Sequence, residues 1–319
     1  MNNPRILIPN TITWALPELP LEVERFDVQN PPTESDAVAL AVWGIPRKVL
    51  APLLGLPSMR WVQSLTAGID HVLDSSARED LIICNGRGLH DAPTAEMAVA
   101  LLLEATRGLH FFRDQQHKAI WDRSAYANQL EGKSKYLGTL EGTRVLILGM
   151  GTIGLEIARR LQPFGAIVEG VATTEGERDG FPTHAFSSLD ELLPNFDALV
   201  MVLPDTPETQ GILSRDRIGM MKPHSWVVNV GRGSAIDEPA VIEALEAGQI
   251  GGAALDVASR EPLPAESKLW TLENVILAPH VAGGGPRFYQ KASDLLARNA
   301  RAFVNGDALE NVISRARGY

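Results

Sequence analysis

The sequence predicts an α/β protein with two doubly wound parallel sheets, the first of them discontinuous along the chain. Short apolar runs alternate with helical patterns over most of the 319 residues, which indicates strands joined by helical crossovers. A glycine-rich strand-to-helix turn lies in mid-chain, and a helical stretch follows the last strand. We therefore expect a first domain of residues 1–97 and 285–319 and a second domain of residues 98–284.

The first series of elements consists of short apolar runs between polar, proline-rich connectors. The runs cover residues 6–8, 37–42, 61–65 and 81–84, and they predict parallel strands. The pattern then changes to helical spacing, carried by Ala95, Ala98, Leu101, Leu102 and Ala105. We expect a helix over residues 93–107, with Pro93 in its first turn.

The second series begins at Arg144 with a strand, the glycine turn and a helix over residues 153–164. Further strands are predicted at residues 167–171, 198–203, 226–230, 253–257 and 275–277. Helices are expected near Leu189 and over residues 238–247. A final helical stretch over residues 286–305 follows the last strand, and its return to the first domain would make that domain discontinuous.

Composition and charge exclude several classes of protein. The chain is 45% hydrophobic and has no apolar segment long enough to span a bilayer. A net charge of -10 without a basic patch argues against a nucleic-acid-binding surface. Cys84 is the single cysteine, which excludes an internal disulfide, and the chain enters a strand soon after Arg5 without the apolar core of a secretory signal. We expect a cytoplasmic protein without a metal site.

The glycine turn has the pattern G-x-G-x-x-G and reads Gly149-Met150-Gly151-Thr152-Ile153-Gly154. In this pattern Gly149 permits the tight turn, Gly151 lets a pyrophosphate approach the backbone, and Gly154 lets the helix pack against the strand. Glycines punctuate many other strand-to-helix turns, so a purely structural role stays open on this motif alone. The motif predicts a dinucleotide site in a Rossmann-like domain.

Polar residues that directly follow the strands of a doubly wound sheet are candidates for binding and catalysis, because ligands bind beyond the carboxyl ends of the strands. Arg232, Glu261 and His280 each follow a predicted strand. An arginine can bind a carboxylate with two parallel hydrogen bonds, and a histidine beside a carboxylate can exchange a proton near neutral pH. Considered one at a time, Arg232 could be a surface charge, Glu261 a helix-cap acid and His280 a loop histidine. Together they suit oxidation of an alcohol beside a carboxylate.

The motifs together resemble those of the D-isomer-specific 2-hydroxyacid dehydrogenases, over nearly the whole chain. Besides the glycine turn, the resemblance rests on residues 203–209 (LPDTPET), 229–233 (NVGRG), Asp256 with 261–264 (EPLP), and Pro279-His280. It implies hydride transfer between NAD(P)H and C2 of a 2-oxo acid or D-2-hydroxy acid. It also implies that Arg232 binds and polarises the substrate, that His280 is the general acid/base, and that Glu261 hydrogen-bonds His280 and favours its protonated form.

The resemblance assigns further residues to the ligands. The segment of residues 64–71 is similar to one that offers backbone N–H groups to the substrate carboxylate, which makes Ala67 and Gly68 the candidates. Asp256 would accept from the nicotinamide carboxamide. The remaining cofactor candidates lie in the glycine turn and after the following strands: Gly149 to Gly154, Thr173, Thr174, Leu203, Pro204, Thr209, Val230 and Gly231. A homodimer is the family expectation, and roles for Arg87 and His90 at the substrate stay open.

The end of the strand at residues 167–171 bears on the choice of dinucleotide. NAD-preferring relatives have an aspartate there, which binds the ribose hydroxyls and repels a 2′-phosphate. This chain has Ala172, Thr173 and Thr174, so we expect a preference for NADP, with NAD as the alternative. The nearest arginine is Arg178, and the acidic residues of the segment, Glu175 and Glu177, oppose a phosphate.

A second function of a different class stays open at this point. The same fold resembles that of the C-terminal-binding-protein corepressors, which would make the chain a nucleotide-sensing interaction module. Within the enzyme family, the motifs do not choose among glyoxylate/hydroxypyruvate reductases, phosphoglycerate dehydrogenases and phenylpyruvate-type reductases. The related formate dehydrogenases are disfavoured, because they resemble this chain but have glutamine at the position of Glu261.

Overall fold

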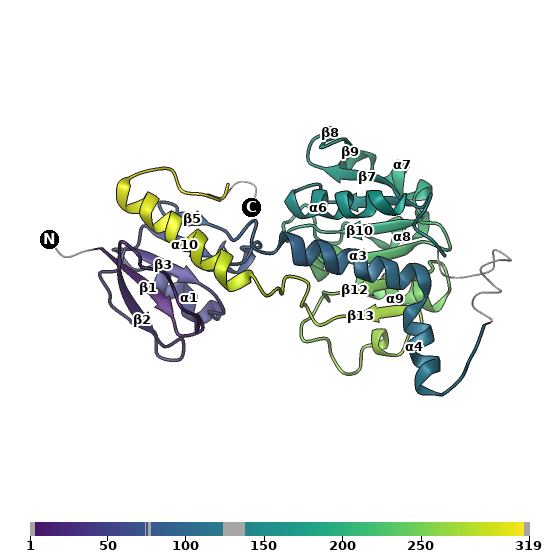
Figure 1. The fold of residues 1–319 in the computed structure, drawn as a ribbon, viewed down its shortest axis with the longest axis horizontal. Helices are drawn as coiled ribbons and strands as arrows, with labels where there is room; N and C mark the ends of the chain where they lie inside the picture. The colour runs from purple at the N-terminus through teal and green to yellow at the C-terminus, as the bar shows by residue number, and fades with distance from the viewer. Residues whose placement is uncertain (1–3, 74, 76–77, 124–137, 316–319) are drawn as a thin grey trace. The chain divides into compact units, whose positions relative to one another are not determined.

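The computed structural model describes residues 4–73, 75, 78–123 and 138–315, which form two compact units. Unit 1 comprises Met1–His90 and Gly284–Tyr319, and unit 2 comprises Asp91–Gly283 (Figure 1). The predicted α/β fold with a discontinuous first domain is confirmed. The predicted domain boundary between residues 97 and 98 lies inside helix α3 (Asp91–Arg107), which belongs entirely to unit 2.

Unit 1 contains a parallel sheet in the order β2-β1-β3-β4-β5. Its strands are β1 (Arg5–Pro9), β2 (Glu22–Phe26), β3 (Ala39–Val42), β4 (Trp61–Ser64) and β5 (Ile82–Cys84). Its helices are α1 (Arg47–Leu54), α2 (Asp70–Leu73) and α10 (Phe288–Asn305). Because β1 lies between β2 and β3, the chain reverses its direction of travel across the sheet at the β1/β3 pair.

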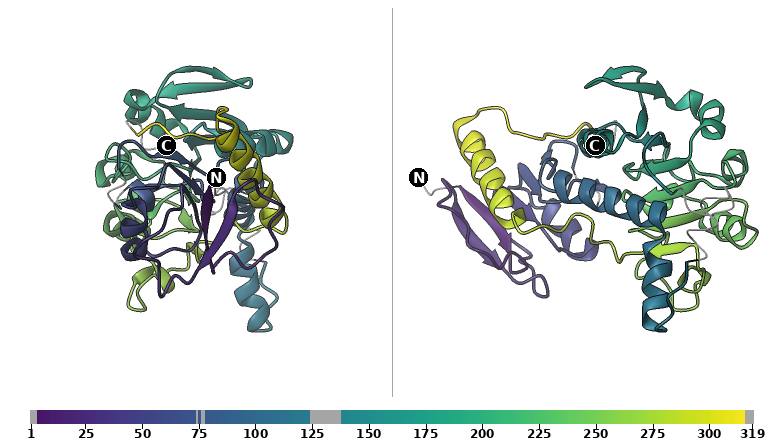
Figure 2. Two further views of the ribbon diagram at one scale, coloured as in Figure 1. Left: turned by 90° about the vertical axis from the view of Figure 1, so that its left-hand side faces the viewer. Right: turned by 45° about the vertical axis from the view of Figure 1, so that its right-hand side comes forward.

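The two faces of this sheet are buried by different helices, because successive side chains of a strand point to opposite faces. Leu7 packs with residues of α1 and α2, whereas Ile6 and Ile8 pack with the apolar face of α10. Figure 2 shows α10 beside the strands of unit 1 from two further sides. A buried hydrogen bond of 2.7 Å from Asn299 Nδ2 to Gln63 Oε1 joins α10 to β4.

Unit 2 contains a sheet in the order β13-β12-β11-β10-β6-β7-β9-β8, in which only the β8–β9 pair is antiparallel. Its strands are β6 (Arg144–Leu148), β7 (Ile167–Ala172), β8 (Gly176–Arg178), β9 (Phe181–Ala185), β10 (Ala198–Met201), β11 (Trp226–Asn229), β12 (Gly252–Leu255) and β13 (Val275–Leu277). Besides α3, its helices include α4 (Leu109–His117), α6 (Thr152–Leu161), α7 (Leu189–Leu192), α8 (Arg215–Met220) and α9 (Glu238–Glu246). This is the strand order of a dinucleotide-binding sheet, with its reversal at the β6/β10 pair.

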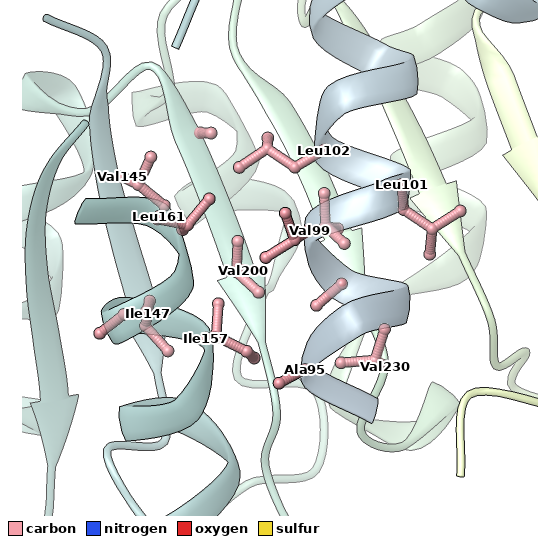
Figure 3. Close-up of a cluster of buried hydrophobic side chains, with 14 of the residues drawn as sticks. Ala95, Val99, Leu101, Leu102, Val145, Ile147, Ile157, Leu161, Val200 and Val230 are labelled. Atoms are coloured by element: carbon pink, nitrogen blue, oxygen red, sulfur yellow. The ribbon is translucent and has the colours of Figure 1, made fainter. Parts of the chain in front are cut away.

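Helices cover both faces of the sheet of unit 2. Figure 3 shows one face, where Leu102 of α3 and Ile157 of α6 pack with Val200 of β10. The buried residues of α6 are Gly154, Ile157, Ala158 and Leu161, which is the spacing of a single helix face. Apolar residues of α7, α8 and α9 cover the opposite face. Packing on both faces thus holds the sheet between two layers of helices.

The β8–β9 hairpin was not among the elements predicted from the sequence. Its turn residues, Asp179 and Gly180, have φ angles of 53° and 81°. An Asp-Gly pair in this left-handed conformation is the preferred two-residue hairpin turn. None of the helices in the described part of the chain is long and apolar enough to cross a membrane.

Candidate active site

The glycine turn between β6 and α6 is shaped by close backbone packing at two of its glycines. Gly149 has a φ of 107°, and a Cβ there would lie 2.7 Å from the carbonyl oxygen of Val202. A Cβ at Gly154 would lie 2.0 Å from the carbonyl oxygen of Gly149, so only glycine lets the helix approach its own turn. A Cβ at Gly151 would meet nothing within 4 Å. The turn therefore leaves space in front of the α6 N-terminus, where a phosphate group is stabilised.

Arg178, which the sequence motifs did not assign to the dinucleotide site, connects this turn to the end of β7. Arg178 Nη1 donates to the carbonyl oxygen of Met150 over 2.8 Å, and Nη2 donates to Thr174 Oγ1 over 3.0 Å. Thr173 and Thr174 are exposed. Arg178 is the last residue of β8 and pairs with Phe181 of β9, directly before the hairpin turn. Because the hairpin fixes β8 beside β9, and β9 pairs with β7, recognising the Asp-Gly turn could have brought Arg178 to the end of β7.

The loop after β10 lies against the loop after β11. A Cβ at Gly231 would lie 2.7 Å from the backbone nitrogen of Leu203, so Val230 and Gly231 follow their strand in close contact with this loop. The buried Thr209 hydroxyl donates to the carbonyl oxygen of Pro204 over 2.6 Å. The contacts of Thr209 thus hold the shape of residues 203–209.

The three predicted catalytic residues follow strands that end at the same level of the sheet. Asn229 at the end of β11 pairs with Leu255 of β12, and Leu255 pairs with Leu277 of β13. The loops that carry Arg232, Glu261 and His280 therefore leave from one edge of unit 2. Arg232 is partly buried, and its Nη1 donates to the carbonyl oxygen of Gly231 over 2.9 Å.

His280 and Glu261 form a hydrogen-bonded pair, as the family resemblance implied. His280 Nδ1 lies 2.6 Å from Glu261 Oε2, and Glu261 Oε1 accepts from the backbone N–H of Ala258 over 3.1 Å. Since a carboxylate only accepts, Nδ1 carries the hydrogen, and Nε2 is the nitrogen available for proton exchange. The histidine ring is 49% exposed, which keeps Nε2 accessible.

Asp256 fixes the backbone that carries His280. Its carbonyl oxygen accepts from the His280 N–H over 2.7 Å, and its carboxylate accepts from the N–H groups of Val281 and Ala282 over 2.9 and 3.0 Å. Asp256 is 1% exposed. His280 has a φ of 54°, which is unusual for a residue other than glycine, and these bonds hold it there.

In unit 1, the loop after β4 carries the candidate carboxylate-binding residues Ala67 and Gly68. Their carbonyl oxygens are engaged, since Ala67 accepts from Asn85 Nδ2 over 3.1 Å and Gly68 accepts from Thr66 Oγ1 over 2.7 Å. Within the part of the chain that the structure describes, their backbone N–H groups have no acceptor. Two adjacent N–H donors in a partly buried loop suit a carboxylate.

The two residues whose roles stayed open from the sequence also lie in unit 1. Arg87 is exposed, and its guanidinium lies 3.5 Å from Asn311 Oδ1. His90 is partly buried, and its Nε2 lies 3.0 Å from the carbonyl oxygen of Leu65, next to the carboxylate-binding loop. Among the described residues, no cluster of His, Cys, Asp and Glu has the geometry to hold a metal ion.

Comparisons with known proteins identify the family of the chain. Residues 99–282 match the family model described as "D-isomer specific 2-hydroxyacid dehydrogenase, NAD binding domain". The chain is 33% identical over 262 residues to a hydroxyphenylpyruvate reductase of Plectranthus scutellarioides, covering 80% of this chain and 78% of the relative. It is 30% identical over 332 residues to a glyoxylate reductase of Thermococcus kodakarensis, covering 95% of each.

A solved structure resembles the whole chain. An NADPH-dependent glyoxylate/hydroxypyruvate reductase from Sinorhizobium meliloti, in complex with NADP and sulfate, superposes with a TM-score of 0.83 at 26% identity. The match covers 100% of both chains.

Proposed function

Because the chain belongs to the D-isomer specific 2-hydroxyacid dehydrogenase family, we propose that His280 is the general acid/base of an NAD(P)-dependent oxidoreductase acting on 2-oxo acids. The observation that carries this role is the 2.6 Å contact between His280 Nδ1 and Glu261 Oε2. It fixes the ring orientation and selects the tautomer with the hydrogen on Nδ1. When bound, the nicotinamide supplies a hydride to C2 of the 2-oxo acid or accepts it from the D-2-hydroxy acid.

The side chains then have distinct tasks in the reduction. His280 Nε2 gives its proton to the oxygen that becomes the hydroxyl group, and it regains a proton from solvent afterwards. Arg232 binds the substrate through its guanidinium and stabilises the charge that develops on that oxygen. The backbone N–H groups of Ala67 and Gly68 bind the carboxylate. In the oxidation direction, His280 accepts the hydroxyl proton instead.

The residues of unit 2 fit a dinucleotide. The open space at Gly151 and the closely packed Gly149 and Gly154 suit a pyrophosphate at the α6 N-terminus. We assign the cofactor to Gly149, Met150, Gly151, Thr152, Ile153 and Gly154, with Leu203, Pro204, Thr209, Val230, Gly231 and Asp256 along the following loops.

We propose NADP as the preferred dinucleotide. Thr173 and Thr174 follow β7 where an NAD-selective enzyme has an acid. Arg178 supports the proposal because its guanidinium lies beside Thr174 and adds a fixed positive charge that a 2′-phosphate can meet. Dual use of NAD is the alternative.

We propose that the protein is a homodimer that contacts its partner through unit 2. Large apolar side chains are exposed on α4 and directly after it, namely Leu109, Phe112, Ile120 and Trp121. Such a concentration is typical of surfaces that another chain covers. Light scattering should give twice the mass of one chain, whereas a monomeric mass at micromolar concentration would contradict the dimer. We further propose a cytoplasmic location, in which the single, buried thiol of Cys84 stays reduced.

The test of the enzymatic function is NADPH consumption with glyoxylate, hydroxypyruvate and phenylpyruvate. We expect turnover with at least one of them, and loss of turnover but retained NADPH binding in the His280→Ala variant. Normal turnover in that variant would overturn the role of His280. The named relatives are reductases, so the nucleotide-sensing alternative is not favoured. Inactivity of the wild-type protein across a broad panel of 2-oxo acids would instead favour the nucleotide-sensing function.

A further inference from the structure

Unit 1 contains a cluster of aromatic rings that the proposed catalytic steps do not use. The Trp43 and Phe288 rings lie 4.5 Å apart between centroids, and His90 stacks on both, at 6.4 Å from Trp43 and 5.0 Å from Phe288. Trp14 extends the cluster at 5.9 Å from Phe288 and 4.6 Å from Tyr289. We call these residues the aromatic cluster.

The aromatic cluster lies at the edge of the sheet where ligands bind. Trp14 follows β1, Trp43 directly follows β3, and His90 follows β5, so all three leave the carboxyl ends of parallel strands. β1 and β3 are the pair at which the sheet reverses its strand order, and ligands of open α/β sheets bind at that point. Phe288 and Tyr289 join them from the start of α10.

A hydrogen bond ties the aromatic cluster to the proposed carboxylate-binding loop. His90 Nε2 lies 3.0 Å from the carbonyl oxygen of Leu65, two residues before Ala67. The stacked rings therefore begin at the loop that carries Ala67 and Gly68. A ligand held by that loop lies near the first ring of the aromatic cluster.

The aromatic cluster is incompletely covered by the rest of unit 1. Phe288 is 8% exposed, but Tyr289 is 55% exposed, and Trp14, Trp43 and His90 are partly buried. Phe288 belongs to the core on this face of the sheet, and Trp14 and Trp43 pack against the margin of that core. Their partly exposed rings leave aromatic surface that a ligand can cover. The remaining surface can stack on one more ring.

We propose that the aromatic cluster binds the side chain of the substrate and that this side chain is an aromatic ring. The preferred substrate is then an aryl-substituted 2-oxo acid rather than glyoxylate or another small 2-oxo acid. This inference rests on the proposed function, since it assigns the side-chain selectivity of that same site.

The experiment compares kcat/KM for phenylpyruvate, pyruvate and glyoxylate with NADPH. Phenylpyruvate should exceed pyruvate by roughly tenfold or more, because the two acids differ only by the ring. Trp43→Leu and Tyr289→Ala should each lower kcat/KM for phenylpyruvate severalfold and leave glyoxylate, which has no side chain, unchanged. Trp43→Phe is the matched control and should retain most of the phenylpyruvate activity. Tyr289 is exposed, so its replacement leaves the fold intact.

Calorimetric binding of D-3-phenyllactate and D-lactate to the NADP-bound protein separates the two proposals. Tighter binding of phenyllactate, weakened in Tyr289→Ala, supports the aromatic site even if turnover is low. Equal kcat/KM for phenylpyruvate and pyruvate together with equal binding of the two hydroxy acids would overturn it. So would an equal loss for phenylpyruvate and glyoxylate in the variants. Turnover of none of the 2-oxo acids would instead contradict the proposed function, and the binding comparison would still decide the aromatic site.

Discussion

Glu261 holds His280 through one carboxylate oxygen, Oε2 at 2.6 Å from Nδ1, while its other oxygen accepts from the backbone of its own loop. The acid is therefore fixed at both oxygens, and the ring orientation follows from the loop geometry. An amide at this position can still accept from Nδ1, but it carries no negative charge beside the ring.

The Glu261→Gln variant should therefore lower kcat for 2-oxo acid reduction by roughly ten- to a hundredfold, part of the contribution of general acid/base catalysis. KM should change less, because the substrate-binding groups are untouched. Steady-state kinetics at a fixed neutral pH give both constants. The control is Glu243→Gln, since Glu243 is exposed and pairs with Arg215. Equal kcat values in Glu261→Gln and the wild-type protein would show that the pair does not serve proton transfer.

Replacement of Arg178 tests the choice of dinucleotide. In the Arg178→Ala variant, KM for NADPH should rise about tenfold, because a charge-assisted contact to a phosphate contributes on the order of 1.4 kcal/mol or more. KM for NADH should stay nearly constant, since it has no 2′-phosphate. Arg215→Ala is a suitable control, because Arg215 is an exposed arginine engaged by a carboxylate. A parallel rise of both KM values, or a strong NADH preference of the wild-type protein, would refute the NADP preference.

Two glycines of the dinucleotide turn should respond differently to alanine. Gly154→Ala places a Cβ 2.0 Å from the Gly149 carbonyl oxygen, so it should destabilise the protein by about 1 to 3 kcal/mol. Gly151→Ala meets no protein atom within 4 Å, so it should fold normally but bind NADPH more weakly. Thermal unfolding and fluorescence titration with NADPH measure the two effects. Unchanged NADPH affinity in Gly151→Ala would place the pyrophosphate elsewhere.

The acid stability of the protein should depend on Asp197. Burial raises the pKa of this carboxyl, but hydrogen bonds from Lys222, the Arg144 N–H and His224 outweigh burial and hold the pKa below its ordinary value of 3.8. The group therefore stabilises the fold above the unfolded-state pKa, and this contribution is lost as the pH falls through the folded-state pKa.

Denaturant unfolding at neutral pH and near pH 3 tests this dependence. Asp197→Asn should lower the free energy of unfolding at neutral pH, and it should lose less stability on acidification than the wild-type protein. The exposed Asp307→Asn serves as the control. An identical pH dependence of wild type and Asp197→Asn would contradict the assignment.

The thiol of Cys84 should be unreactive in the folded protein. Its side chain is fully buried at the end of β5, and burial raises its pKa to about 11. Since the thiolate is the reactive species, a disulfide reagent at about pH 8 should modify the protein only after denaturation. The Cys84→Ser variant gives the background. Rapid modification of the native protein would show that β5 opens readily.

Site residues that directly follow a strand could be located from the sequence alone. Gly149, Arg232 and His280 each follow an apolar run, and in a parallel sheet such positions gather at one edge. The strand β2 was missed because Glu22 and Val23 are exposed in it, so its pattern is not that of a buried strand. Arg178 was missed as a neighbour of Thr174, because the Asp-Gly turn that pairs β8 with β9 was not recognised.

Sequence patterns could not predict the aromatic cluster, for a different reason. Trp14, Trp43, His90 and Phe288 come from four separate loops or helix ends, and no periodicity connects them. Their proximity depends on the strand order of unit 1 and on the return of α10. Such contacts between distant segments follow from tertiary packing and not from local propensity.

The buried bond between Asn299 and Gln63 has a consequence for the order in which the protein folds during synthesis. β5 leaves the ribosome roughly 200 residues before α10, which at about 5–20 residues per second is a delay of roughly 10 to 40 seconds. Unit 2 is complete before that helix exists. The face of the first sheet formed by Ile6 and Ile8 therefore stays uncovered by α10 while unit 2 is synthesised. That apolar face of the nascent first sheet is thus open to non-native contacts until α10 is synthesised.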